Sequence, residues 1–319
     1  MRGLLFSESY RPLFSGHETF ALRQLWLKKA LELAVGATSQ TSYDNDKPKP
    51  RAKNVFSEES SIVALGVGKN MVASMRHWAT ACDVLNEVDG IPAPTQFGSS
   101  IFGSEGLDPY SEHPTTLWLI HWKLAGGWAL PPNRTHRSTT WFWVFNYIHE
   151  QSFSSQDLLR ALSEYADQRG GRLSPATLKR DLEVCFRSYI DRSETGTVDD
   201  FADSMLGELG LLTIQARDEY ALRRGPKATL SNGAFLYALI EFWQAFAPTT
   251  STLSFETIAY EIGSPGRVFK LDEDSVAARL IDLEAFTRSK YQWSDSAGMR
   301  QVICKTPMDL QAALELAYA

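Results

Sequence analysis

The chain has 319 residues, 44% of them hydrophobic, which is enough for two or three domains with sizeable cores. Its net charge of −6 argues against a nonspecific nucleic-acid coat and confines any DNA contact to local patches. The widely spaced Cys82, Cys185 and Cys304 exclude a disulfide framework and a zinc cluster. No apolar run is long enough for a membrane span and no signal peptide is evident, so we expect a cytoplasmic protein without membrane contact.

The first predicted elements lie in residues 13–66. A glycine-containing loop over 13–20 leads into a helix that ends near residue 35. Polar, proline-containing residues 37–54 predict a mobile loop, whose basic end either touches a phosphate backbone or is simply solvated. The acids that follow Ser57 predict the first turn of a short helix ending near Gly66.

Residues 69–82 predict an amphipathic helix. With a step of about 100° per residue, the apolar face holds Met71, Val72, Met75, Trp78, Ala79 and Cys82. The opposite face holds Lys69, Asn70, Ala73, Arg76, His77 and Thr80. This face has no acid of its own and offers cations for phosphates and polar groups for base edges, as a recognition helix does. The alternative is a solvated helix with incidental charge.

A Pro/Gly-containing stretch over residues 91–98 predicts a wing or crossover after this helix. The order of helix, glycine turn, helix and wing is typical of a winged helix-turn-helix.

Further elements follow in the same style. We expect a helix over 108–128, a buried aromatic segment over 139–148, helices over 154–170 and 174–189, a short helix over 199–209, a hairpin over 211–224 and a helix over 231–247. Residues 254–304 predict another winged unit, with a helix over 272–285 and a closing hairpin. Because this last helix opens with three acids, Asp272 to Asp274, we expect the unit to be structural or protein-binding.

These elements predict a mainly α fold of multiple winged helix-turn-helix-like units with small β-hairpin wings. We divide the chain into a helical, winged-helix DNA-binding domain over 1–150 and a domain of winged-helix-like units over 151–319.

Three groups of residues suggest chemistry. Adjacent His17 and Glu18 in a glycine loop could act as base and acid or bind a divalent ion, or His17 could bond to backbone while Glu18 caps a helix. Asp108 is either a metal ligand or a helix cap. The Gly66–Lys69 turn lacks the spacing of a Walker motif, so we reject nucleotide binding.

Motifs in the first 150 residues closely resemble a bacterial family of SspB-type proteins. They are Phe14-Ser-Gly-His-Glu-Thr-Phe20 with Arg23 and Trp26-Leu-Lys-Lys29, Leu65-Gly-Val-Gly-Lys-Asn-Met-Val72 with Arg76 and Trp78, Asp108-Pro-Tyr110, Thr116-Leu-Trp-Leu119 with His121, and Thr140-Trp141 before Phe145-Asn146. The second half of the chain resembles the family more weakly.

This resemblance implies a function. SspB-type proteins belong to single-stranded DNA phosphorothioation systems, which act in anti-phage defence. It implies a DNA-nicking endonuclease, a phosphodiester hydrolase that depends on Mg²⁺ or Mn²⁺ and works with a cysteine desulfurase, a sulfurtransferase and an ATPase. The alternatives are a non-catalytic winged-helix adaptor or transcription regulator, and a protein-interaction scaffold; a homodimer is left open.

The candidate residues follow from both arguments. We predict His17 and Glu18 as catalytic residues and Glu18 and Asp108 as metal ligands. The predicted DNA contacts are Lys69, Asn70, Ser74, Arg76, His77, Lys179, Arg180, Arg267 and Lys270.

Overall fold

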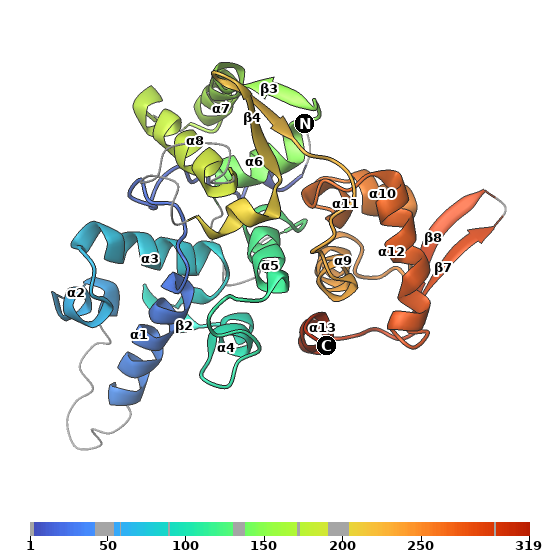
Figure 1. The fold of residues 1–319 in the computed structure, drawn as a ribbon, viewed down its shortest axis with the longest axis horizontal. Coiled ribbons are helices and arrows are strands. Elements are labelled where there is room, and N and C mark those ends of the chain that lie inside the picture. Colours follow the sequence, from blue (N-terminus) through green and yellow to red (C-terminus); the bar gives the residue numbers. More distant parts are fainter. Residues whose placement is uncertain are drawn as a thin grey trace.

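The structure, a computed structural model, describes residues 3–41, 54–57, 59–88, 90–129, 138–170, 173–190, 204–296 and 298–319. In this part of the chain the fold is mainly α-helical with small antiparallel sheets, as the sequence predicts (Figure 1). Most of the polar loop predicted over 37–54, and the start of the helix predicted over 199–209, lie outside the described residues.

The N-terminal elements surround helix α3. They are α1 (Trp26–Thr41), α2 (Glu59–Leu65), α3 (Lys69–Ala81), the hairpin β1 (Leu85–Val88) and β2 (Ile91–Pro94), and α4 (Gln96–Phe102). Helix α3 packs on α1 because its apolar side chains, Val72, Met75 and Trp78, are buried between them. Helix α4 occupies part of the stretch predicted as a wing, and Thr95 caps it by accepting the Gly98 amide.

Two helices that are apolar on all sides form the centre. Residues 115–125 of α5 (Pro114–Ala125) and residues 139–146 of α6 (Thr139–Tyr147) are all buried. Helices of this kind need neighbours on every face. Figure 1 accordingly shows α5 between the N-terminal helices and α9. The expectation that the aromatic segment over 139–148 belongs to the core is confirmed.

The next elements form a small α/β group. They are β3 (Ser152–Ser154), α7 (Ser155–Gln168), α8 (Pro175–Tyr189), the 3-10 helix η4 (Met205–Leu209), β4 (Leu212–Ala216) and β5 (Glu219–Leu222). The predicted hairpin is present, and β3 joins it to give the strand order β3-β5-β4. Helix α8 packs against α6 and α7, which places its buried face next to the centre of the molecule.

The C-terminal elements pack around α9. They are α9 (Asn232–Phe246), β6 (Thr252–Ser254), α10 (Phe255–Tyr260), α11 (Pro265–Val268), α12 (Glu273–Phe286), β7 (Tyr291–Ser296), β8 (Met299–Cys304) and α13 (Leu310–Ala317). Strands pair in the order β6-β8-β7, and α11 contacts both α6 and α9 (Figure 1).

Two features differ from prediction. Helix α5 begins at Pro114 rather than Asp108, because residues 108–113 form the turn that caps it. The predicted winged unit over 254–304 also contains the short helix α11 before its main helix. Winged-helix packing of these helices and hairpins, and the division near residue 150, stay predictions. No helix in the described part of the chain is long and apolar enough to cross a membrane.

Candidate active site between the N-terminal loop and helix α3

Helix α3 has the two faces that its sequence predicts. The side chains of Val72, Met75 and Trp78 are buried, whereas Lys69 and Asn70 are exposed. The exposed face continues through Ala73, and Arg76, His77 and Thr80 are partly buried there. The polar face is thus available to a ligand at its N-terminal end and partly covered further along.

Ser74 does not lie on the exposed face. Its side chain is fully buried, and its Oγ donates a hydrogen bond of 2.9 Å to the carbonyl oxygen of His17. The N-terminal loop covers this position on α3. The predicted contact of Ser74 with DNA therefore has no support in this geometry.

A cavity of about 330 Å³ lies between the N-terminal loop and the partly covered end of α3. The loop and α3 supply most of its wall, and β1 and the residue before α6 supply the rest. The lining residues are Leu13, Ser15, Gly16, Glu18, Ala73, Arg76, His77, Thr80, Ala81, Glu87 and Ser138. Glu18, Arg76 and His77, which the sequence singled out separately, thus meet in one cavity, so we take it as the candidate site.

The loop has an unusual backbone beside this cavity. Gly16 has φ of 111°, and Glu18 and Thr19, which are not glycines, have φ of 47° and 69°. Side chains rarely adopt positive φ, and such residues persist where the surroundings hold them in place. At Gly16 an added Cβ would lie 2.5 Å from His77 Nδ1, so the close approach of loop and helix requires glycine.

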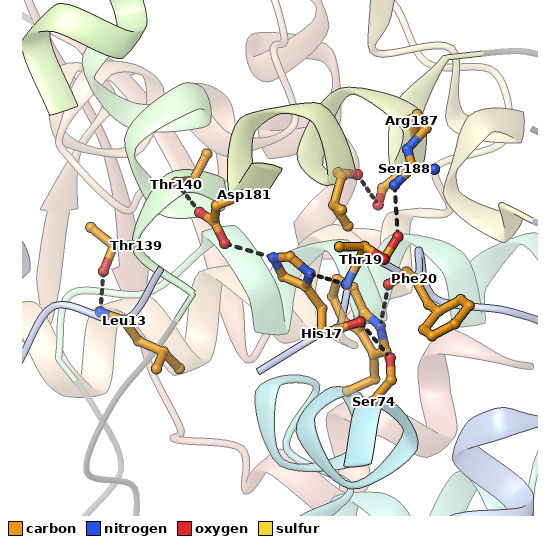
Figure 2. Close-up of polar contacts among 12 residues, drawn as sticks. Leu13, His17, Thr19, Phe20, Ser74, Thr139, Thr140, Asp181, Arg187 and Ser188 are labelled. Carbon is orange, nitrogen blue, oxygen red and sulfur yellow. Dashed lines mark hydrogen bonds and ion pairs between the residues drawn. The ribbon is translucent and has the colours of Figure 1, made fainter. Parts of the chain in front are cut away.

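Buried hydrogen bonds hold the loop (Figure 2). His17 Nδ1 accepts the Thr19 amide at 3.1 Å, so the ring proton is on Nε2, which donates to Asp181 Oδ1 at 2.8 Å. The other Asp181 oxygen accepts from Thr140 Oγ1. Arg187 Nη2 donates to the Thr19 carbonyl at 2.7 Å. Helices α6 and α8 therefore fix the conformation of the loop.

These contacts give His17 a positioning role. Its side chain is buried, its ring lies 5.9 Å from that of His77, and both of its nitrogens are already hydrogen-bonded. It does not line the cavity, whereas exposed Glu18 does. Of the two predicted catalytic residues, the geometry favours Glu18 as the group that reaches a substrate.

Arg76 is paired within the cavity. Its Nε and Nη2 lie 2.9 and 2.5 Å from Glu87 Oε1, which comes from strand β1. The acid-free face of α3 is therefore met by a carboxylate from the next element. A ligand phosphate would have to share Arg76 with Glu87 or displace the Glu87 carboxylate from Arg76.

The residues predicted to bind a metal do not meet. Both Asp108 oxygens are used at the start of α5: Oδ1 accepts the Glu112 amide, and Oδ2 accepts the His113 amide and Thr116 Oγ1. Asp108 thus holds the turn that leads into α5, whose N-cap is His113, and its role is closer to the capping alternative than to a metal ligand. Within the described residues, no group of three or more His, Cys, Asp or Glu side chains could hold a metal ion. The predicted metal ligands therefore do not fit a divalent ion held by protein groups alone.

The remaining predicted DNA contacts lie on other elements. Lys179 and Arg180 are exposed on α8. Arg267 is partly buried and donates to the carbonyl of Tyr260 at 2.7 Å. Lys270 is only 2% exposed, so its predicted contact with DNA is not available to the side chain as it lies in this structure.

Sequence reasoning missed several residues of the site. Glu87, Ser138 and the support from Asp181 and Arg187 come from elements outside the loop and α3. A carboxylate buried on the inner side of α8 is a signal that could have identified Asp181, because such groups require partners.

Comparisons with known proteins identify the family and the fold of the chain. Residues 14–318 match the family described as "Protein of unknown function (DUF4007)". The chain belongs to this family. No curated protein sequence matches it.

Two solved structures are similar over nearly the full length of this family member. One is described as a magnesium ion-bound SspB crystal structure, with a TM-score of 0.81, and the other as an SspB crystal structure, with a TM-score of 0.80. Each is 25% identical, with 97% of this chain and 88% of the other covered. The chain therefore has the SspB fold, as its motifs indicated.

Proposed function

We propose that this protein is a DNA-binding endonuclease that nicks one strand in an SspB-type phosphorothioation system acting in anti-phage defence. The observation that carries the proposal is the convergence of Glu18, Arg76 and His77 in one cavity. Likeness to SspB over 97% of the chain supports the assignment to such a system.

The cavity holds the residue types that phosphodiester hydrolysis needs. The reaction requires a group that orients or deprotonates the attacking water, a cation for the developing phosphate charge and a donor for the leaving oxygen. Glu18 would orient the water, Arg76 would bind a non-bridging phosphate oxygen, and His77 would exchange a proton. Exposed Lys69 and Asn70 would contact the duplex at the other end of the same helix.

Dependence on Mg²⁺ or Mn²⁺ is part of the proposal because the family resemblance implies it. One similar solved structure is described as magnesium-bound. We assign no residue of this chain as a ligand, since the described residues offer no complete set. Nicking assays with and without a chelator test the requirement directly.

The decisive experiment uses supercoiled plasmid, purified full-length protein and Mg²⁺ or Mn²⁺. We expect relaxed circles with the wild type and a rate about 100-fold lower with Glu18→Gln, since one acid–base group contributes on this scale. Fluorescence anisotropy should show that Glu18→Gln still binds DNA. Exposed Glu105, which lies outside the cavity, provides the matched control Glu105→Gln with wild-type nicking.

The second candidate is a DNA-binding adaptor or transcription regulator without catalytic activity. The pairing of Arg76 with Glu87 favours it, because this cation is already partly neutralised. If the wild-type protein binds DNA but yields no relaxed circles with either ion, the nickase proposal is wrong and this second candidate takes its place. Co-purification with a cysteine desulfurase, a sulfurtransferase or an ATPase tests the proposed partners under both.

A further inference from the structure

Cations from separate segments gather at the end of α6 that lies away from the cavity. The loop between β5 and α9 contacts the segment after α11: the Gly225 amide donates to the Lys270 carbonyl at 2.9 Å, and Arg224 Nη1 donates to the Leu271 carbonyl at 3.1 Å. Arg267 Nη1 donates to the carbonyl of Asn146, near the C-terminal end of α6. We call the five side chains brought together here the cation cluster: Arg223, Arg224, Lys227, Arg267 and Lys270.

Backbone carbonyls accept hydrogen bonds from Arg224, Lys227 and Arg267 of the cluster. Lys227 Nζ donates to the carbonyls of Arg223 and Gly225, both at 3.0 Å. Lys270 is buried, with its Nζ 5.9 Å from the centre of the Phe145 ring. Carbonyls and rings stabilise a cation without cancelling its charge, so the exposed cations of the cluster form a local basic patch in a protein of net charge −6.

Two carboxylates near the cluster also bond to backbone amides. The Asp272 carboxylate attracts Lys227 electrostatically. Its Oδ1 also accepts the Ser275 amide at 2.8 Å, which caps α12. The Glu261 carboxylate attracts Arg267 electrostatically. Its Oε1 also accepts the Ile262 amide at 3.0 Å. Each of these two acids thus divides its charge between a cation of the cluster and a backbone amide.

Burial and mutual repulsion destabilise the protonated forms of the two lysines in the cluster. Burial lowers the pKa of Lys270 well below its usual value, and nearby Arg224 and Arg267 lower it further. The pKa of Lys227 falls to about 8, first through burial and then through neighbouring arginines, against the opposing effect of Asp272. A bound anion would relieve this repulsion.

The cluster opens to solvent through Arg223 and Arg224, whose side chains are exposed. Two adjacent exposed arginines suit phosphate oxygens, which guanidinium groups bind with two hydrogen bonds. We propose that the exposed arginines of the cation cluster, Arg223 and Arg224, bind the phosphate backbone of DNA, as a second contact separate from the cavity; this rests on the proposed function.

Helix α6 relates the two contacts. Ser138, at its N-terminal end, lines the cavity, and the Asn146 carbonyl near its other end holds Arg267. At 1.5 Å per residue, these positions lie about 12 Å apart along the helix axis. That length corresponds to about four base pairs of duplex. One DNA segment would thus be held at two points set by a single rigid element.

Salt dependence of DNA binding tests the proposal. Fluorescence anisotropy of a labelled duplex over a range of KCl concentrations gives the slope of log affinity against log salt, whose magnitude decreases by about 0.9 for each phosphate that the protein ceases to neutralise. We expect Arg223→Gln/Arg224→Gln to weaken binding at least tenfold, equally for two unrelated sequences, and to reduce the slope by between about 1 and 2. Arg224→Lys should keep the wild-type slope.

The matched control is Lys305→Gln, which removes an exposed cation from the same end of the chain, outside the cluster. Thermal unfolding followed by circular dichroism verifies that each variant folds. A wild-type slope and affinity in the folded double variant would overturn the cluster as a DNA contact, even if nicking itself is confirmed.

The assay also separates this inference from the proposed function. Cluster variants should raise the KM for plasmid nicking and leave kcat within about twofold, because they act on ground-state binding. Glu18→Gln should instead lower kcat. Failure of the wild type to bind DNA would contradict both the proposed function and the cluster as a DNA contact. Wild-type binding and nicking, with cluster variants that behave as wild type, would contradict only the cluster as a DNA contact.

Discussion

His17 Nε2 lies 2.8 Å from Asp181 Oδ1, although the two residues are 164 positions apart in the chain. Asp181 is the buried acceptor for both His17 and Thr140. Replacing it with alanine leaves two buried donors without a partner, at a cost of about 1–3 kcal/mol each. We expect Asp181→Ala to lower the free energy of unfolding in urea by roughly 2–5 kcal/mol and to impair nicking through the displaced loop.

The control for this prediction is Glu183→Ala on the same helix. Glu183 is exposed, and its oxygen lies 3.9 Å from Lys179 Nζ. Surface pairs of this kind contribute at most about 1 kcal/mol. Equal unfolding midpoints for Asp181→Ala and Glu183→Ala would show that the buried network does not hold the loop.

Gly16, which lines the cavity, and Gly68, the N-cap of α3, differ in what an added methyl group meets. At Gly16 it would lie 2.5 Å from His77 Nδ1 with φ at +111°, whereas at Gly68 nothing lies within 4 Å. We expect Gly16→Ala to destabilise the protein by about 1–3 kcal/mol and to reduce nicking. Gly68→Ala changes only the N-cap of α3, so it should cost no more than about 1 kcal/mol and leave nicking unchanged. Urea unfolding and plasmid relaxation measure both effects; full activity in folded Gly16→Ala would contradict the site.

Substitutions of Arg76 and Glu87 should change the affinity for DNA in opposite directions. Arg76→Ala removes the cation and should weaken binding about tenfold, the scale of one charge-assisted contact. Glu87→Gln removes the carboxylate that competes for Arg76 and should strengthen binding severalfold. Anisotropy titrations at fixed salt compare the two. A weaker complex with Glu87→Gln would mean that the ion pair itself, rather than free Arg76, is what DNA requires.

Proton uptake on DNA binding tests the charge state of the cation cluster. The pKa of Lys227 is lowered to about 8, so the amine is only partly protonated at that pH. The charged groups that face it are Asp272, Arg224, Arg223 and Arg279. A phosphate nearby raises the pKa, so binding should take up protons at pH 8 and hardly any at pH 6, where the amine is already charged.

Calorimetry in two buffers of different ionisation enthalpy detects this uptake. The observed binding enthalpy should depend on the buffer at pH 8 but not at pH 6. Lys227→Arg stays charged at both values and should lose most of the buffer dependence while retaining binding. Equal enthalpies in both buffers at pH 8 for the wild type would count against phosphate near Lys227.

The buried His121 should make the free energy of unfolding decrease in acid. Its Nε2 donates to the Val268 carbonyl at 3.0 Å and its Nδ1 accepts from the Tyr189 hydroxyl at 2.8 Å, so the ring is neutral. Burial is the main cause that lowers its pKa from 6.5 to about 3. Between these values the unfolded chain binds a proton that the folded chain does not, so stability is full above pH 6.5 and falls below it by about 1.4 kcal/mol per pH unit.

The measurement is urea unfolding at pH 7 and pH 5. The loss of free energy of unfolding between them should be about 2 kcal/mol smaller in His121→Gln than in the wild type. His121→Gln lowers stability at pH 7 as well, so the difference between the two pH values is the relevant quantity. An unchanged difference would mean that His121 is protonated in the folded state.

Local patterns in the sequence predicted much of the fold. The burial of Val72, Met75 and Trp78 follows from helical periodicity, and Ser174 and Pro175 start α8 where their capping chemistry places them. Ser74 and Lys270, which the sequence predicts as DNA contacts, are buried for one reason: each is polar in sequence, and only tertiary packing decides that a loop or an aromatic ring covers it.

The site itself was only partly predictable. The motif around Glu18 and the face of α3 indicated its residue types, but their meeting in one cavity depends on contacts between distant segments. Glu87 and Asp181 could be assigned only once the loop was placed against β1 and α8. The adjacent Arg223 and Arg224 are visible in the sequence, whereas their proximity to Lys270 is not.

The loop beside α3 relies on Asp181 and Arg187, which lie beyond residue 150. A truncated protein ending near that position would keep Glu18, Arg76 and His77 but lose the groups that hold the strained backbone. Deletion mapping would then report an inactive fragment even though every cavity-lining side chain is retained. Point substitutions in the intact chain are therefore the appropriate way to dissect this protein.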